Sequence, residues 1–233
     1  MKLAIMQPYF FPYIGYFQLM NAVDEFIVYD NIEFSKKGWV NRNRILVNGN
    51  DVMFTLPLKK DSDFLNIGDR YLADIWSEEK IKLLNKITET YRKAPFFKSA
   101  YPVIEQSVLC NESNLFKFIL NSLVQMKAYL GIATPLAISS QIKIDHGLRS
   151  EEKVIAVCKS RNADVYINPI GGLELYNKSR FKDSGIQLCF LEANNIQYAQ
   201  FGQPFVPFLS MIDVMMFNST QQIAEFLSQY TVR

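Results

Sequence analysis

The chain has 233 residues, of which 49% are hydrophobic, and its formal net charge at pH 7 is only +2. This length and apolar content exclude a disordered chain and fit a single α/β domain with room for a small helical insert. The weak positive charge gives no general signal for DNA binding. No stretch is long and apolar enough to span a membrane, so we expect no integral membrane contact.

The cysteines and the single histidine bear on compartment and metal binding. Cys110, Cys158 and Cys189 have no metal-like spacing, and the segment 1–6 is too short and too soon interrupted to be a signal peptide. We therefore expect reduced thiols and a cytoplasmic protein. A sole histidine, His146, also excludes a multi-histidine site, and we expect no metal centre in the protein itself.

The first half of the chain predicts a strand–helix–strand unit and then a hairpin. An apolar run over 2–6 predicts a buried strand, and a helix is expected over 12–22, beginning at a proline. Residues 24–30 predict a second strand, parallel to the first. Asn48-Gly49-Asn50 lies between the β-prone runs 44–48 and 51–57 and is typical of a hairpin turn.

Helices dominate the middle of the chain, and strands alternate with helices after it. The middle helices are expected over 77–91, 95–109 and 114–129, capped by Ser77 and Ser113 in the first and third. We expect residues 77–131 to be a helical insert or lid within one domain, 1–233. Further strands are expected over 135–139, 164–168 and 186–192, with helices over 149–160 (capped by Ser150), 173–184 and 220–230. The order predicts an α/β fold: a doubly wound, mainly parallel, Rossmann-like sheet with a β-hairpin excursion and a helical insert.

Ligands of open parallel sheets bind beyond the carboxyl ends of the strands, and an aromatic loop follows the first strand here. Its prolines and rings exceed what a strand-to-helix connection needs, and a helix amino end would suit a phosphate or carboxylate. The alternative is a rigid turn packed by its own aromatics. The candidate substrate-binding residues of this loop are Gln7, Tyr9, Tyr13 and Tyr16.

A second group of candidates follows the second strand. Asp30 could hold a magnesium ion, a ribose or an amine, or simply cap a turn. The segment 36–44 then combines cations, amides and a tryptophan, and arginine forks suit phosphate or carboxylate. A solvated surface loop is the alternative. The candidate substrate-binding residues here are Trp39, Asn41, Arg42, Asn43 and Arg44.

Two further positions carry polar groups that need an explanation. His146 is a candidate general base, with Asp145 nearby, or else an ordinary turn histidine. Asp213 lies with Ser210 in an apolar run, and a buried carboxylate requires a partner. We expect that partner to be a loop N–H or an arginine such as Arg42 or Arg44, and take Ser210 and Asp213 as substrate-binding candidates.

Taken together, these motifs closely resemble the WbqC-like protein family. They are Gln7-Pro8-x-x-x-Pro12-Tyr13-x-Gly15-Tyr16-Phe17, then Asp24, Asp30, Phe34, Trp39-x-Asn41-Arg42-Asn43-Arg44 and Leu209-Ser210-x-x-Asp213. The resemblance implies a role in biosynthesis of bacterial surface polysaccharides such as the O-antigen of lipopolysaccharide. It also implies a transferase that joins glycine, or another acyl group, to a nucleotide-linked amino sugar.

A more distant similarity links Tyr13-Ile14-Gly15-Tyr16 to the His-x-Gly-His signature of nucleotidyltransferases and pantothenate synthetases. Those enzymes stabilise phosphate charge with two imidazoles during adenylate formation. A phenol can donate a hydrogen bond but carries no positive charge near neutral pH. Arg42, Arg44 or Lys36 would have to supply that charge here.

Three functional hypotheses follow: an acyl or aminoacyl transferase, a non-catalytic nucleotide-sugar-binding module, and a nucleotidyltransferase. In the transferase, Arg42 and Arg44 would bind phosphate and the tyrosines the sugar or base. Asp30 or His146 would be the catalytic base that accepts the amine proton. The donor would be an adenylate, which requires ATP with Mg²⁺, a preformed thioester, or an aminoacyl-tRNA; the sequence does not identify the cofactor.

Overall fold

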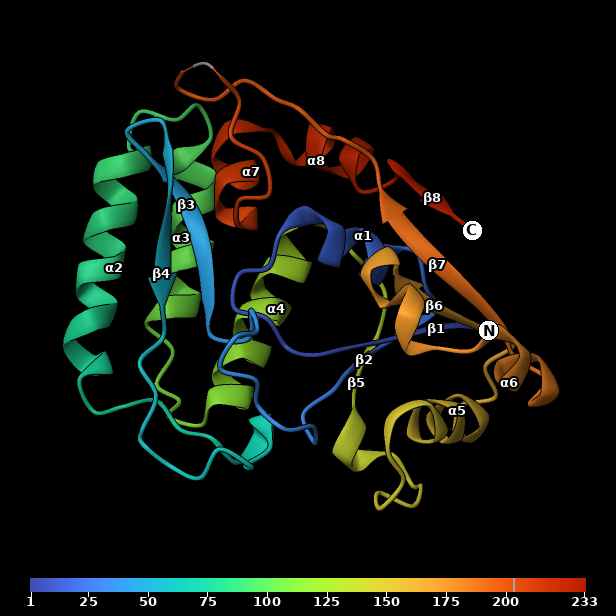
Figure 1. Cartoon of the computed structure of the whole chain (residues 1–233). Helices are drawn as coiled ribbons and strands as arrows, with labels where there is room; N and C mark the ends of the chain where they lie inside the picture. The colour runs from blue at the N-terminus through green and yellow to red at the C-terminus, as the bar shows by residue number, and fades with distance from the viewer. Residues whose placement is uncertain (203) are drawn as a thin grey trace.

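The structure, a computed structural model, describes residues 1–202 and 204–233, and its centre is a six-stranded sheet in the order β5-β2-β1-β6-β7-β8 (Figure 1). Neighbouring strands pair in parallel, except that β8 is antiparallel to β7. The strands are β1 (Lys2–Met6), β2 (Glu25–Val28), β5 (Leu136–Ile138), β6 (Val165–Pro169), β7 (Gln187–Ala193) and β8 (Tyr230–Val232).

Helices cover both faces of this sheet, because alternate strand residues point to opposite sides. Leu3 and Ile5 of β1 pack with residues of α5 (Ser150–Ser160) and α6 (Lys178–Asp183). Ala4, between them, belongs to a second apolar cluster that includes α1 (Ile14–Asn21). The predicted α/β class, with a mostly parallel sheet, is confirmed.

Strand β1 lies at the point where the order of the sheet reverses. From β1 the chain passes through α1 to β2 on one side, whereas β6 lies on the other side and leads through α6 to β7. The crevice at the carboxyl end of such a strand is the usual ligand site of open α/β sheets. The aromatic loop, which we define as residues 7–13, follows β1 at this position.

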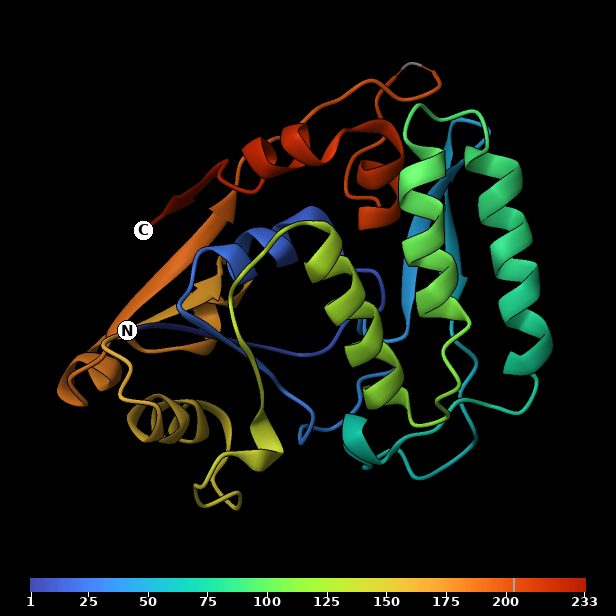
Figure 2. The same ribbon diagram turned by 180° about the vertical axis from the view of Figure 1, so that it is seen from behind.

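The predicted hairpin is confirmed and forms a separate two-stranded sheet of β3 (Arg42–Val47) and β4 (Asn50–Thr55). Asn48 and Gly49 both have positive φ, at 52° and 79°, as a tight two-residue hairpin turn requires. Helices α2 (Trp76–Tyr91), α3 (Phe97–Val108) and α4 (Leu115–Tyr129) pack with the hairpin. Figure 2 shows α4 lying between the sheet and the layer formed by α2 and α3.

One apolar cluster joins α1, the hairpin and the three middle helices, so their packing is continuous with the sheet. The expected helical segment 77–131 coincides with α2–α4. Its description as an insert or lid within one domain stays a prediction. In the part of the chain that the structure describes, no helix is long and apolar enough to cross a membrane.

The sequence-based boundaries were wrong mainly near the carboxyl terminus. The helix expected over 220–230 is the shorter α8 (Thr220–Phe226), followed by the edge strand β8. A strand of this length is too short for alternation to reveal it. The helix expected over 173–184 is a 3₁₀ segment, Ile170–Leu175, and then α6.

The expected helix caps also differ. Ile75 precedes α2, Asn114 caps α4 by accepting from the Lys117 N–H, and Arg149 precedes α5. Ser77, Ser113 and Ser150 are therefore not the caps.

Candidate functional site

The aromatic loop is held in a strained conformation. Phe11 is fully buried and has a φ of 46°, in the left-handed region, although it precedes Pro12. A residue before proline normally adopts an extended conformation, and a left-handed φ costs an L-residue about 1–2 kcal/mol. The surrounding structure must therefore stabilise this turn.

Two buried side chains supply that stabilisation at a single carbonyl group. The Asn43 side-chain amide and the Ser210 hydroxyl each donate to the Phe11 carbonyl oxygen, both over 2.7 Å. The Ser210 N–H donates to the Arg44 carbonyl, and the Met211 N–H to the Pro12 carbonyl. Ser210 also caps α7 (Met211–Phe217) by accepting from the Ile212 N–H. The loop is thus fixed to the hairpin and to α7.

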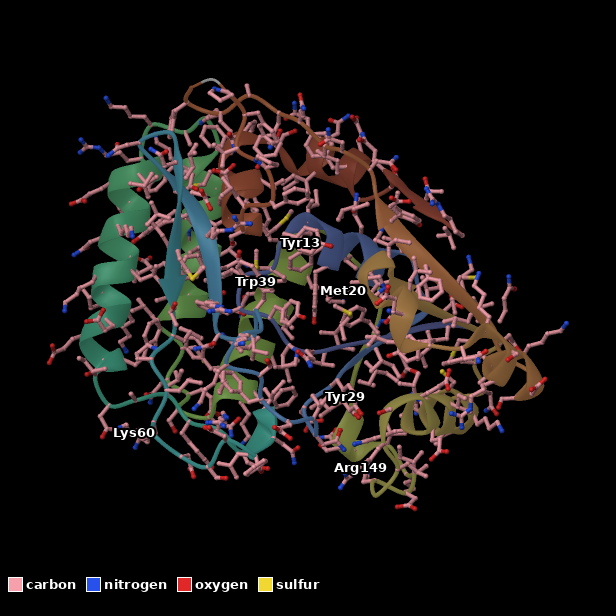
Figure 3. All side chains as sticks on the ribbon, viewed as in Figure 1. Tyr13, Met20, Tyr29, Trp39, Lys60 and Arg149 are labelled. Carbon is pink, nitrogen blue, oxygen red and sulfur yellow. The ribbon has the colours of Figure 1, made fainter. Side chains whose placement is uncertain are left out.

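Beside the fixed loop lies a cavity of about 220 Å³, which we call the aromatic cavity. Figure 3 shows Tyr13 and Trp39 near one another in this region. Tyr13 is 36% exposed, Trp39 39% and Phe208 72%, so these rings are unusually accessible for their size. The lining residues are Tyr9, Pro12, Tyr13, Trp39, Asn43, Arg44 and Phe208.

Arg44 gives this cavity a positive charge and an open hydrogen-bond donor. Its guanidinium lies 5.4 Å from the Trp39 ring centroid and donates to Asp51 over 2.8 Å. Its buried Nε–H has no acceptor among the described residues. A buried donor without an acceptor is costly, and the rest of the guanidinium, which lines the cavity, could pair with an oxyanion of a ligand.

The tyrosines of the cavity are donors, not bases. Burial raises the pKa of Tyr9, with a further contribution from Tyr13, and burial also raises the pKa of Tyr13. Both phenols therefore stay protonated near neutral pH. The Tyr13 ring folds over Gly15, where an added Cβ would come within 2.4 Å of it, so this ring position requires glycine.

Several other predicted site residues hold the loop and hairpin instead of lining the aromatic cavity. Tyr16 is buried, and its hydroxyl donates to the backbone carbonyl of Gln7. Asn41 donates to the Leu56 carbonyl. Arg42 donates to the carbonyls of Gly38 and Lys37, and its guanidinium lies 5.6 Å from the Trp39 ring centroid. Their direct contact with a substrate stays a prediction.

Asp213 has three partners, and the expectation of an arginine or a loop N–H was wrong. Its fully buried carboxylate accepts from the hydroxyls of Tyr91 and Tyr198 and from the Gln200 amide, over 2.7–2.8 Å. Burial raises the pKa of Asp213, while these three hydrogen bonds act in the opposite direction. Tyr198 and Gln200 belong to the segment after β7, so Asp213 fixes that segment to α7.

Asp30 and His146, the predicted catalytic residues, lie together beyond the ends of β2 and β5, outside the lining of the aromatic cavity. The Asp30 carboxylate accepts from the backbone N–H and hydroxyl of Ser140. His146 Nδ1 lies 2.9 Å from the Asn31 side-chain nitrogen, while the Asn31 side-chain oxygen accepts from Ser139. With the Asn31 amide in this orientation, its NH₂ donates to Nδ1, which assigns the proton of a neutral His146 to Nε2.

Lys153 joins this second cluster and was missed in the sequence, where a lysine in a helix is ordinary. It is only 6% exposed, donates to the Asn31 carbonyl over 3.0 Å and lies 5.1 Å from the Tyr29 ring centroid. Burial lowers the pKa of Lys153, and the negative charge of Asp30 acts in the opposite direction. Figure 3 shows Tyr29 and Arg149 beside α5, away from Tyr13 and Trp39.

Phe208 was also missed, since one phenylalanine in an apolar run carries no signal. Its φ of 57° turns it out of that run toward solvent. For a metal site, the described residues contain no group of three or more His, Cys, Asp or Glu side chains placed to hold an ion.

Comparison with known proteins identifies the family. The model of the WbqC-like protein family matches residues 7–225. The chain belongs to this family. Membership suggests a role in polysaccharide biosynthesis. A curated relative, "Uncharacterized protein Rv1507c" of Mycobacterium tuberculosis, is 27% identical over 233 residues, covering 97% of each chain. No solved structure matches the chain.

In this WbqC-like protein, the motif residues divide into two roles. Tyr13, Trp39 and Arg44 line the aromatic cavity, whereas Ser210 fixes the aromatic loop and Asp213 fixes the segment after β7 to α7. Asn43 does both, since it lines the cavity and donates to Phe11. The motif thus encodes a shaped cavity as well as its lining.

Ser210→Ala should destabilise the protein more than Ser219→Ala. Both serines cap short helices, but only Ser210 also donates to Phe11. Loss of a cap costs about 1 kcal/mol, and loss of one of the two donors to the Phe11 carbonyl should add roughly 1 kcal/mol. Urea unfolding of both variants measures the difference, and equal losses would show that the Phe11 contact contributes nothing.

The raised pKa of Asp213 predicts a pH-dependent difference between wild type and Asp213→Asn. The folded state binds this proton more tightly than the unfolded state, whose value is near 3.8. Wild type should therefore gain stability relative to the variant as the pH falls from neutral toward 3.8. The measurement is the melting temperature of both proteins across this pH range. The other titrating groups contribute equally to both, so the difference in melting temperature reports Asp213. A difference that does not change with pH would contradict the prediction.

Proposed function

We propose that this WbqC-like protein binds a nucleotide-linked amino sugar in the aromatic cavity and transfers an acyl group, such as glycine, to its amine. The Arg44 guanidinium, which lines the aromatic cavity beside the Trp39 ring, carries the proposal. A phosphate group matches a guanidinium in charge and in hydrogen-bonding pattern. The rings of Tyr9, Tyr13 and Trp39 suit the flat faces of a base or a sugar.

The reaction requires the sugar amine in its neutral form, because an ammonium has no lone pair to attack a carbonyl. The nitrogen would bond to the acyl carbon, lose its proton to a base and expel the group that activated the acyl donor. An adenylate formed with ATP and Mg²⁺, a thioester or an aminoacyl-tRNA would each serve as donor. The protein would act on the cytoplasmic side of a surface-polysaccharide pathway such as that of the O-antigen.

Of the two predicted bases, Asp30 is the better supported. The hydrogen bond from Asn31 to His146 Nδ1 leaves a proton on Nε2, so His146 faces a substrate as a donor. Among the described residues, Ser140 alone donates to the Asp30 carboxylate, through two hydrogen bonds that leave lone pairs free. Neither residue lines the aromatic cavity, so the role of Asp30 as the base that accepts the amine proton stays a prediction, as does that of His146 in positioning or polarising the acyl group.

Arg44→Lys should weaken binding of phosphate-bearing ligands by about tenfold or more, because lysine keeps the charge but loses the Nε–H fork. Trp39→Ala should weaken the same ligands through the lost ring. Arg180→Lys is the matched control, since Arg180 pairs with Glu151 and Glu152 away from the cavity. Thermal shift with UDP- and dTDP-sugars provides the measurement. Equal shifts in all variants would place the ligand elsewhere.

Wild-type protein supplied with a nucleotide-linked 4-amino sugar, ATP and glycine, or with glycyl-tRNA, should form an amide that mass spectrometry detects. Asp30→Asn should lower the rate at least a hundredfold, within the range of general-base catalysis. Absence of the amide product with every acyl donor would contradict the transferase proposal.

A non-catalytic nucleotide-sugar-binding module is the second candidate, and one observation favours it. The described residues lining the aromatic cavity include no carboxylate, imidazole or thiol. Tight binding that survives Asp30→Asn and His146→Ala, without turnover in any form, would establish this alternative.

A further inference from the structure

A second cavity adjoins the aromatic cavity. It measures about 620 Å³, and we call it the amide groove. Residues 193–198, starting at the last residue of β7, form one side of it, and residues 204, 205 and 207–209, before α7, form another. Tyr13 and Phe208 line both cavities. The two cavities therefore lie on either side of, or beside, the same two rings.

The two cavities differ in charge. Arg44 lies in the aromatic cavity, whereas none of the described residues lining the amide groove is charged. Asn195 and Gln197 are exposed residues that line the groove, beside Phe205 and Phe208. Each amide offers both donors and an acceptor. Amides next to aromatic faces fit a neutral ring bearing hydroxyl groups, since hydroxyls both donate and accept and the C–H faces pack on the rings.

The wall of the groove is fixed before any ligand arrives. Tyr198 and Gln200 donate to the buried carboxylate of Asp213 over 2.7 and 2.8 Å. The Gln200 side chain also exchanges hydrogen bonds with the backbone of Val206. This bridge ties both sides of the groove together. A preformed wall lowers the ordering cost of binding.

We infer that the amide groove is a sugar subsite, in which Asn195 and Gln197 bind the hydroxylated ring of the ligand whose phosphate pairs with Arg44. This inference rests on the proposed function, because Arg44 supplies the anchor for the phosphate. The inference assigns each portion of the ligand to its own cavity: the nucleotide portion occupies the aromatic cavity, and the sugar occupies the groove. Tyr13 and Phe208 contact the ligand where the two portions join.

The test uses the double variant Asn195→Ala/Gln197→Ala and compares UDP-N-acetylglucosamine with UDP, and dTDP-glucose with dTDP, by calorimetry. The variant should bind the nucleotide sugars about tenfold more weakly and the diphosphates unchanged, as loss of two neutral hydrogen bonds predicts. Gln106→Ala/Gln221→Ala removes two exposed helical amides outside the groove and is the matched control. Circular dichroism and melting temperature check that both double variants are folded.

The outcomes separate this inference from the proposed function. Equal losses for sugar and diphosphate would place the nucleotide in the groove and overturn the sugar subsite, as would unchanged binding of both. If no nucleotide binds, the proposed function fails, and methyl N-acetylglucosaminide then decides the inference by NMR of the side-chain amides. Shifts at Asn195 and Gln197 in wild type would uphold the subsite, and their absence would overturn it.

Discussion

One carbonyl oxygen, that of Phe11, receives hydrogen bonds from two distant parts of the chain, and the candidate site depends on it. Asn43 comes from the hairpin and Ser210 from the start of α7. The left-handed conformation of Phe11 costs about 1–2 kcal/mol, while each net hydrogen bond contributes roughly 0.5–1.5 kcal/mol. The two bonds thus offset the strain. They also bring Trp39, Arg44 and Phe208 against the aromatic loop, so the strained turn and the cavity form together.

The buried carboxylate of Asp213, in α7, likewise joins distant parts of the chain through hydrogen bonds. An unpaired carboxylate in an apolar helix would be strongly destabilising, but here three donors converge on it. Tyr91 extends the network by also accepting from the Leu46 N–H of β3. Helix α2, the hairpin, α7 and the segment after β7 are therefore joined through one polar centre inside an apolar core. This centre also holds Tyr198, which lines the amide groove.

Two chemically different clusters lie along the carboxyl edge of the sheet. The loop after β1 supplies aromatic rings, and the segments after β2 and β5 supply Asp30, Asn31 and His146. Because β1 and β2 are neighbours, both clusters belong to the same edge. One is suited to holding a flat or phosphorylated ligand, and the other to moving protons. The buried Lys153 adds a further titratable side chain to the second cluster, whereas the first consists mainly of aromatic rings.

The sequence by itself determined the α/β class, the positions of five sheet strands, the hairpin and the family, because periodicity, turn residues and motif spacing are local properties. It also marked the rings of Tyr13 and Trp39 and the charge of Arg44. Only the tertiary structure decided which motif residues line the cavity and which support it. Tyr16 and Ser210 are buried, and Asp213 bonds to tyrosines instead of arginines, because side-chain partners come from segments far apart in the chain. Burial and partnership are properties of the folded arrangement, which no local pattern encodes.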